Sequence, residues 1–222
     1  MLRYIVGDTE TTGLPPGYMP VEIALMEIDG GLNEMRRWYS LVDPEIPIDP
    51  AAQAIHGISA EMVADSPTSN EFIDHVLGGR LEGDLCLIAH NRRFDQPLLE
   101  HIGSITHGIC TLELARHLVR DSANHKLQTL REHFDIEANK AHSAMGDVET
   151  TLGVLRHLVR LSGKTLAELS KATAKTYHVM PFGKFSGQSI LTLPKWYLDY
   201  MVALPDLDPN LLASLTKARK LK

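Results

Sequence analysis

Three segments typical of β-strands follow one another near the start of the chain, with only short turns between them. Alternating, strand-forming residues occupy Leu2–Gly7, Val21–Ile28 and Arg36–Val42. Glycine and proline mark the turns, and a parallel pair would need a longer crossover connection. The chain is therefore expected to begin as an antiparallel meander, and its helices must then cover the faces of that sheet.

After residue 50 the apolar residues recur with helical spacing instead. This pattern predicts one more buried strand at Leu85–Ala89, together with several helices. The fold class that follows is α/β, with a mixed sheet flanked by helices. The helices are expected over residues 50–55, 60–64, 70–77, 96–102, 111–119, 127–134 and 144–161.

The last quarter of the chain differs from the rest. We predict a main domain over residues 1–163, a polar linker or helix over 164–178, and a small basic C-terminal region over 179–222. That region combines a glycine-containing loop, an aromatic helix and a basic helix. Because a segment of this size buries little apolar surface, we expect it to dock on the main domain.

Composition limits the class of protein. Hydrophobic residues make up 44% and charged residues 23%, which is typical of a folded chain. Neither a membrane-spanning apolar run nor a secretory signal is apparent in the sequence. The two cysteines, Cys86 and Cys110, lie in apolar settings that favour buried free thiols in a reducing compartment. These features predict a cytoplasmic protein without a membrane partner.

Charge is distributed unevenly along the chain. Residues 1–150 hold 11 Lys/Arg and 24 Asp/Glu, a net charge of −13, whereas residues 151–222 hold 11 and 4, a net charge of +7. Acidic side chains at the front are suited to binding metal ions, and a basic end is suited to contacting phosphates. On charge alone, an ordinary solvated surface is the simpler explanation.

Acidic residues occur where predicted elements end or begin. Asp8 and Glu10 follow the first strand and point to one face of it. Asp95 follows the buried strand, where Asn91 could cap a helix that Pro97 would shift or kink. Two further candidates precede and open the long helix that Ser143 would cap, namely His142 in the loop and Asp147 on the second turn.

Four carboxylates and one imidazole at the ends of one sheet suggest metal chemistry. Oxygen ligands favour hard cations such as Mg²⁺ or Mn²⁺, and no cysteine or histidine cluster has the spacing of a zinc site. Paired carboxylates also occur in glycoside hydrolysis. Four acids with a histidine are better suited to two-metal cleavage of phosphodiesters.

Three segments of the chain resemble the exonuclease motifs of the DEDD superfamily, in its subclass with a histidine in the third motif. They are DTETTGL at 8–14, AHNRRFD at 89–95 and HSAMGD at 142–147, and HGIS at 56–59 is similar to another segment common there. FGKFSGQS at 182–189 resembles a C-terminal loop of some bacterial DNA exonucleases. The resemblance implies a ribonuclease H-like fold with a central five-stranded mixed sheet.

The resemblance also implies roles for individual residues. Asp8, Glu10 and Asp147 would hold a first Mg²⁺ with the attacking water. Asp8 would bridge to a second ion, and Asp95 would complete the ligands. Mn²⁺ could replace Mg²⁺. His142 would act as the general base. The residues implied in gripping the terminal nucleotide are Thr11 and Leu14, with His56, Asn91 and Phe94 as further candidates.

The function that follows is 3′→5′ hydrolysis of DNA, releasing nucleoside 5′-monophosphates from single strands or 3′ ends during repair or proofreading. The alternatives are an RNA-trimming exonuclease of the same superfamily, a proofreading subunit of the polymerase III epsilon type, and a non-catalytic nucleic-acid-binding module. Motifs do not settle the sugar, because that contact is with the 2′-hydroxyl. Pro15-Pro16, Arg92-Arg93 and Pro97 depart from the family pattern.

Overall fold

A computed structural model gives the structure of the chain as two compact units, residues 1–173 and 174–222, which are described separately. The structure describes residues 2–137, 141–172, 177, 179–204, 207 and 209–222. Within these residues, no helix has the length and apolar character needed to cross a membrane.

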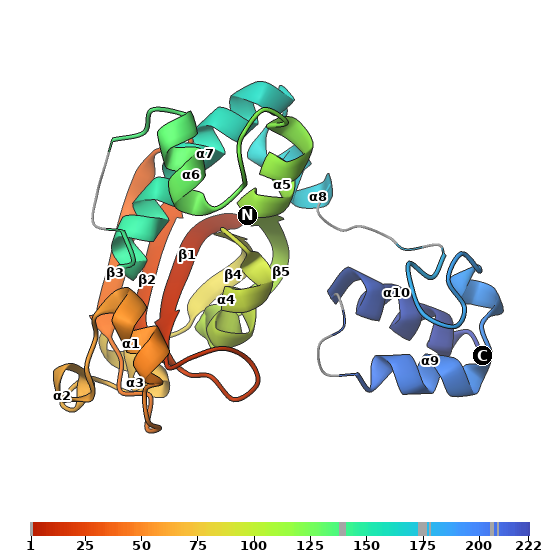
Figure 1. Cartoon of the computed structure of the whole chain (residues 1–222), viewed down its shortest axis with the longest axis horizontal. Helices are drawn as coiled ribbons and strands as arrows, with labels where there is room; N and C mark the ends of the chain where they lie inside the picture. The colour runs from red at the N-terminus through yellow and green to blue at the C-terminus, as the bar shows by residue number, and fades with distance from the viewer. Residues whose placement is uncertain (1, 138–140, 173–176, 178, 205–206, 208) are drawn as a thin grey trace. The chain divides into compact units, whose positions relative to one another are not determined.

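A five-stranded mixed sheet forms the centre of the first unit (Figure 1). The strand order is β3-β2-β1-β4-β5. Strand β2 pairs antiparallel with both β1 and β3, as the short turns predict, whereas β4 pairs parallel with both β1 and β5. The strands are β1 Arg3–Thr11, β2 Pro20–Ile28, β3 Glu34–Leu41, β4 Leu81–Ala89 and β5 Gly103–Cys110.

Side chains alternate between the two faces of this sheet, and each face has its own core. On one face, Val6 and Met26 pack with helix α7 (Ala144–Ser162) and helix α8 (Leu166–Ala172). On the other face, Ile5 and Leu25 pack against α3, α4 and the short η1 turn. The bounds of those three elements are Ser69–His75, Arg92–Leu99 and Glu100–Ile102.

The remaining helices of the first unit complete its outer layer. Helices α5 (Thr111–Leu118) and α6 (Leu127–His133) share a buried cluster with α7. Helices α1 (Pro50–His56) and α2 (Ala60–Val63) follow β3. Asp49 caps α1 by accepting a hydrogen bond from the Ala51 amide at 2.8 Å. A second hydrogen bond, from the Asp49 amide to the Thr12 carbonyl at 2.8 Å, places the start of α1 beside the segment that follows β1.

Strand β5 and the start of α4 differ from the sequence-based expectations. No element was predicted over residues 103–110, yet they form the edge strand β5. Gly103 is required there, because a Cβ at this position would lie 2.7 Å from the Leu81 carbonyl oxygen. Helix α4 begins at Arg92 rather than near Gln96, and Pro97 lies inside it. The proline has no N–H to donate to the Arg93 carbonyl, so the helix contains it with the loss of one backbone hydrogen bond.

Part of the expected linker is helical and belongs to the first unit. Leu166 and Leu169 of α8 are buried in the core between α7 and the sheet. The segment expected to connect the two units is therefore shorter at its start than residues 164–178. Residues 173–176 and 178 lie outside the described residues.

The second unit has a small apolar core of its own, which was not expected from the sequence. Helix α9 (Lys195–Val202) and helix α10 (Pro209–Lys220) pack together with the η2 turn (Ile190–Thr192). Leu198, Leu211 and Leu215 are among its fully buried side chains. Docking of this unit on the first remains a prediction.

Candidate active site

Strand β1 extends beyond its parallel partner, and this extension carries the first acidic motif. Pairing between β1 and β4 ends at Val6 and Ile88, whereas β1 continues to Thr11. Asp8 and Glu10 lie on the same side of the strand as Val6, toward α7. The two carboxylates therefore lie within the strand rather than after it.

Asp95 occupies the space that opens where β4 ends. It lies in the first turn of α4 and is almost completely buried. Its Oδ1 atom accepts hydrogen bonds from the Thr9 amide at 3.1 Å and the Thr9 hydroxyl at 2.8 Å. These bonds attach the second motif to the first. Asn91, expected to cap α4 with its side chain, makes no such bond and has a left-handed backbone.

The third motif is placed by the start of α7. Ser143 caps this helix, as predicted, by accepting from the Gly146 amide at 3.3 Å. Asp147 lies in the first turn rather than the second, and accepts from Gln128 Nε2 at 2.8 Å. His142 precedes the helix with a left-handed backbone (φ 56°) and an exposed side chain.

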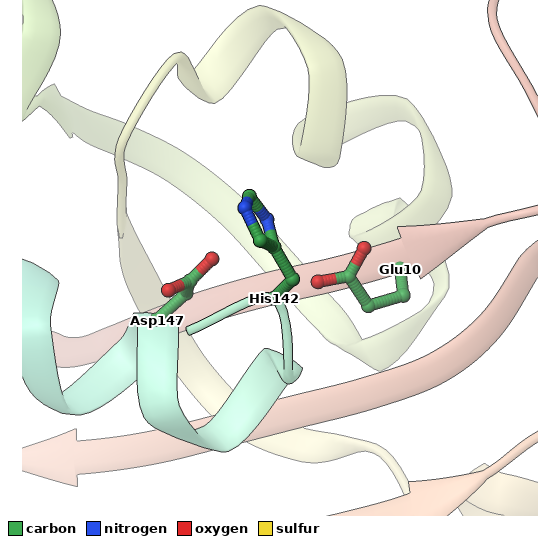
Figure 2. Close-up of side chains that lie close together, drawn as sticks. All are labelled: Glu10, His142 and Asp147. Carbon is green, nitrogen blue, oxygen red and sulfur yellow. The ribbon is translucent and has the colours of Figure 1, made fainter. Parts of the chain in front are cut away.

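Glu10, His142 and Asp147 form the tightest part of the site. Each offers one ligand atom, and these atoms lie within 4.8 Å of one another. Figure 2 shows the imidazole of His142 between the two carboxylates. Asp8 and Asp95 are not part of this group of three among the described residues. Both nevertheless contribute to the same electrostatic environment.

The carboxylates raise one another's pKa values. Burial raises the pKa of Glu10 to about 8, and the charges of Asp147, Glu22 and Asp95 add to that effect. Burial also raises the pKa of Asp95 to about 7, against the hydrogen bonds from Thr9. The pKa of Asp8 is well above its ordinary value, first through burial and then through the charge of Asp95. For Asp147, burial is again the largest cause of a raised pKa.

Raised pKa values show that this group of carboxylates is unfavourable without positive charge beside it. All the carboxylate ligands offer oxygen atoms, the type preferred by hard divalent cations. Both cysteines are buried and free, Cys86 in β4 and Cys110 at the end of β5. The residues present therefore fit a divalent metal ion of the Mg²⁺ type.

Glu22 was not predicted as part of the site. It lies on β2 directly opposite Glu10, and its side chain is buried. Its two carboxylate oxygens accept from the Tyr39 hydroxyl and from the Ala144 amide, each at 2.6 Å. Because Ala144 begins α7, this buried carboxylate attaches the helix that carries the third motif to the sheet. The available signal was a charged residue at position 22, which alternates with Ala24, Met26 and Ile28 on the core-facing side of the strand.

The expected substrate residues lie around the segment after β1. Thr11 is buried, and its hydroxyl donates to the Gly13 carbonyl at 2.8 Å. His56 is buried with both ring nitrogens engaged, Nδ1 by the Ile58 amide and Nε2 by the Thr11 carbonyl. Burial lowers the pKa of His56, so the ring is neutral near pH 7. Leu14 is 80% exposed.

The remaining residues around the second motif support the site by packing. The ring of Phe94 lies 4.9 Å from that of Tyr18, whose hydroxyl donates to the Phe94 carbonyl at 2.7 Å. Arg92 bonds Gln96 and packs over Gly108, where a Cβ would collide with its guanidinium. Arg93 lies 3.5 Å from Glu113.

The fold and site together are typical of a metal-dependent nuclease, and comparison with known families agrees. The family model described as Exonuclease (RNase_T) matches residues 5–155, and the chain belongs to this exonuclease family of hydrolases. The family depends on divalent metal ions. The chain is 33% identical over 199 residues to exodeoxyribonuclease 10 of Escherichia coli (strain K12), covering 86% of this chain and 84% of that protein.

Other relatives cover only part of the chain or part of the relative. The chain is 34% identical over 157 residues to the PolC-type DNA polymerase III of Bacillus cereus, and spans 67% of its own length but 11% of that protein. Among solved structures, exonuclease X in complex with 5′ overhanging duplex DNA matches with a TM-score of 0.62 and 33% identity. It covers 78% of this chain and 99% of that one. Exonuclease I of E. coli with a dT13 oligonucleotide has a TM-score of 0.62 at 17% identity, a likeness of fold.

Proposed function

We propose that this protein is a 3′→5′ exonuclease that uses Mg²⁺ to release nucleoside 5′-monophosphates from DNA 3′ ends. The observation that carries the proposal is the convergence of Glu10, His142 and Asp147 within 4.8 Å of one another. Asp8 and Asp95 complete the acidic surroundings. DNA repair or proofreading is the setting that this activity serves.

The ion-holding residues come from three elements. Asp8 and Glu10 extend from β1, Asp95 from α4 and Asp147 from α7. When bound, divalent ions would activate the attacking water and offset negative charge on the phosphate. Asp95 is held by Thr9 and Asp147 by Gln128, so both carboxylates are fixed before substrate arrives.

His142 takes the proton from the attacking water in this proposal. Its imidazole is exposed and lies beside Glu10 and Asp147, so it can reach a water molecule at the reacting phosphate. Imidazole gains and loses protons in the physiological range, which suits a general base. The left-handed backbone at His142 keeps the ring outside α7, at the edge of the site.

The terminal nucleotide is held beside the segment that follows β1. Leu14 offers an exposed apolar side chain to the last base, and Thr11 follows Glu10 at the end of β1. His56 supports this pocket by fixing the Thr11 carbonyl, and Phe94 supports it by packing on Tyr18. Asn91 is exposed at the start of α4 and is available to the substrate.

The DNA assignment is supported by the names of the relatives. Both the 33% identical exodeoxyribonuclease and the exonuclease X structure are described as acting on or binding DNA. An RNA-trimming exonuclease is the alternative, because the choice between DNA and RNA depends on a contact with the 2′-hydroxyl.

A single assay with two matched substrates tests the proposal. A 5′-labelled DNA strand and an RNA strand of the same sequence are incubated with Mg²⁺, with Mn²⁺ or with chelator. We expect stepwise shortening of DNA from its 3′ end with either metal and none in chelator. Asp8→Asn and Asp147→Asn should abolish cleavage. His142→Ala should lower kcat by about 10²–10⁴-fold.

Asp74→Asn is the matched control, because Asp74 is an exposed carboxylate on α3, away from the three motifs. It should leave cleavage unchanged. Cleavage that persists in chelator or in Asp8→Asn would refute the metal mechanism. Faster shortening of RNA than of DNA would refute the choice of substrate while leaving the reaction in place.

A further inference from the structure

Helix α9 of the second unit divides its aromatic residues between core and solvent. Tyr197 is 5% exposed and packs against Phe185, with ring centroids 4.6 Å apart. Trp196 and Tyr200 are 57% and 58% exposed. Their spacing of four residues places them on one side of the helix. The unit therefore buries one ring for stability and presents two large rings to solvent.

A lysine accompanies the exposed rings. The Nζ atom of Lys184 lies 5.6 Å from the centre of the Trp196 ring and 5.8 Å from that of Phe185. The loop that carries Lys184 is held in shape by backbone hydrogen bonds, from the Gly187 amide to the Met180 carbonyl at 2.8 Å and from the Met180 amide to the Gln188 carbonyl at 2.9 Å. The positive charge is thus placed beside the rings by a defined turn.

The two units have net charges of opposite sign. Residues 174–222 contain seven Lys/Arg and three Asp/Glu, a net charge of +4, whereas residues 1–173 contain 15 and 25, a net charge of −10. Nucleic acid is repelled by the first unit wherever metal ions do not offset its carboxylates. The second unit attracts the same polyanion and is covalently attached to the first.

We propose that the face of α9 formed by Trp196 and Tyr200, with Lys184 beside it, is a second binding surface for single-stranded nucleic acid. Bases stack on the two rings, and the lysine contacts the phosphate backbone. The surface retains the strand between hydrolytic steps and takes no part in them. The inference rests on the proposed function in that the strand bound is the one to be shortened.

The rings could instead contact the first unit, whose negative charge also attracts a basic unit. Single-stranded nucleic acid is favoured because it explains both features of the surface. Its bases stack on the two aromatic rings, and its phosphates attract the lysine. The rival makes a different prediction: truncating the rings would alter the stability of the first unit.

The test uses the full chain and separates binding from hydrolysis. Anisotropy of labelled oligothymidylate and oligouridylate is measured in chelator, where the acidic site holds no metal. Trp196→Ala and Tyr200→Ala should each weaken binding by about fivefold or more, the range for loss of one stacked base. Lys184→Glu should weaken binding and reduce its dependence on salt.

Two variants of the first unit serve as matched controls. Leu161→Ala removes another exposed apolar side chain, and Lys164→Glu makes the same charge change as Lys184→Glu. Both should leave the affinity for the oligonucleotide within about twofold of the parent, because surface changes away from a binding site have small effects. Tyr200→Ala and Lys184→Glu keep the test informative if Trp196→Ala disturbs folding through Phe185.

A spectroscopic measurement locates the contact. The chain contains two tryptophans, Trp38 and Trp196, so the Trp38→Phe variant leaves Trp196 as the only indole. Stacking of a base on that ring should quench its emission as oligothymidylate is added. Hydrolysis of a small chromogenic phosphodiester, the p-nitrophenyl ester of thymidine 5′-monophosphate, should be unchanged in all three second-unit variants.

The outcomes are distinct. Equal affinity of parent and variants, or absence of quenching at saturating oligonucleotide, would overturn the inference. Ring truncations that leave oligonucleotide affinity unchanged but alter the unfolding of the first unit would overturn it in favour of docking. Ring-dependent binding in a chain that hydrolyses no nucleic acid would support this surface while refuting the proposed function.

Discussion

The two units place their polar side chains in different ways. In the first unit, carboxylates from β1, α4 and α7 are buried or half-buried and raise one another's pKa values. In the second unit, the core is apolar, and an ion pair such as Arg219–Asp199, at 3.0 Å, lies in solvent. Burying carboxylates therefore lowers the stability of the first unit in order to place charge at the site. The second unit buries apolar side chains and leaves its charged side chains in solvent.

The largest expected difference between the units is in whether each stays folded after a buried leucine is changed to alanine. Leu25 and Leu198 are both fully buried, one in each unit. Changing either to alanine should cost about 2–5 kcal/mol. A unit of 49 residues has about 2–7 kcal/mol to lose, so Leu198→Ala should unfold the second unit while the first still hydrolyses the small phosphodiester.

Each unit contains one tryptophan, which makes that comparison measurable. Urea unfolding followed by emission reports the second unit in Trp38→Phe and the first unit in Trp196→Phe. We expect Leu198→Ala to shift only the Trp196 signal and Leu25→Ala to shift the Trp38 signal. A single transition shared by both tryptophans in every variant would show that the units do not fold independently.

The next effect concerns Glu22, which attaches α7 to the sheet. Glu22→Gln should lower kcat by about 10–100-fold, because a displaced start of α7 moves His142 and Asp147. KM and the unfolding of the first unit should change little. Glu27→Gln is the matched control, since Glu27 is a buried carboxylate of the same strand that pairs with Arg3 at 2.7 Å.

Glu27→Gln should affect stability and leave kcat unchanged, the opposite of Glu22→Gln. Tyr39→Phe removes one of the two hydrogen bonds to Glu22 and should give a smaller loss of kcat. Equal kcat values for parent and Glu22→Gln would mean that the carboxylate has a packing role only.

The smallest effect is a pH dependence confined to the first unit. His90 lies between Thr111 and the His125 carbonyl, each 2.9 Å from a ring nitrogen, and burial lowers its pKa to about 4. Because the unfolded histidine has a pKa of about 6.5, the unfolded chain binds more protons between these values. The stabilisation is complete above about pH 6.5 and is lost as the pH falls toward 4, with a loss on the order of 2 kcal/mol at pH 5.

Urea unfolding near neutral pH and near pH 5 is compared between the parent and His90→Asn, because the raised pKa values of Glu10 and Asp95 change stability in the opposite direction over the same range. His90→Asn should remove the histidine contribution. His117→Asn, at an exposed position of α5, should not. The second unit, residues 174–222, contains a single histidine, His178, and serves as the reference for histidine titration outside the first unit. An equal pH dependence in both units would assign the effect to other groups.

Much of the first unit could be predicted because its strands and helices have strong periodic patterns. The meander, the long helix and its Ser143 cap were predicted and are confirmed. Strand β5 was not predicted, because Gly103 and Gly108 have low strand propensity and interrupt the pattern around the strand formers Ile105 and Thr106. Its strand conformation comes from pairing with β4.

The sequence motifs indicated which residues lie at the candidate site, but not the hydrogen bonds that hold them in place. The motifs named Asp8, Glu10, Asp95, His142 and Asp147, and the structure places them around one region of the sheet. The hydrogen bond from Thr9 to Asp95 spans 86 positions and that from Ala144 to Glu22 spans 122, so no local pattern encodes either. Such contacts arise only when the whole sheet has formed.

Gly103 has a consequence for how variants of this protein are interpreted. It begins β5 opposite Leu81, at the other end of β4 from the second motif. Any side chain there would push against the backbone of β4 and disturb the edge of the sheet. In a mutational survey scored by activity alone, a substitution at 103 would therefore be mistaken for a catalytic lesion, although it touches no reacting group and would be revealed only by measuring the amount of folded protein.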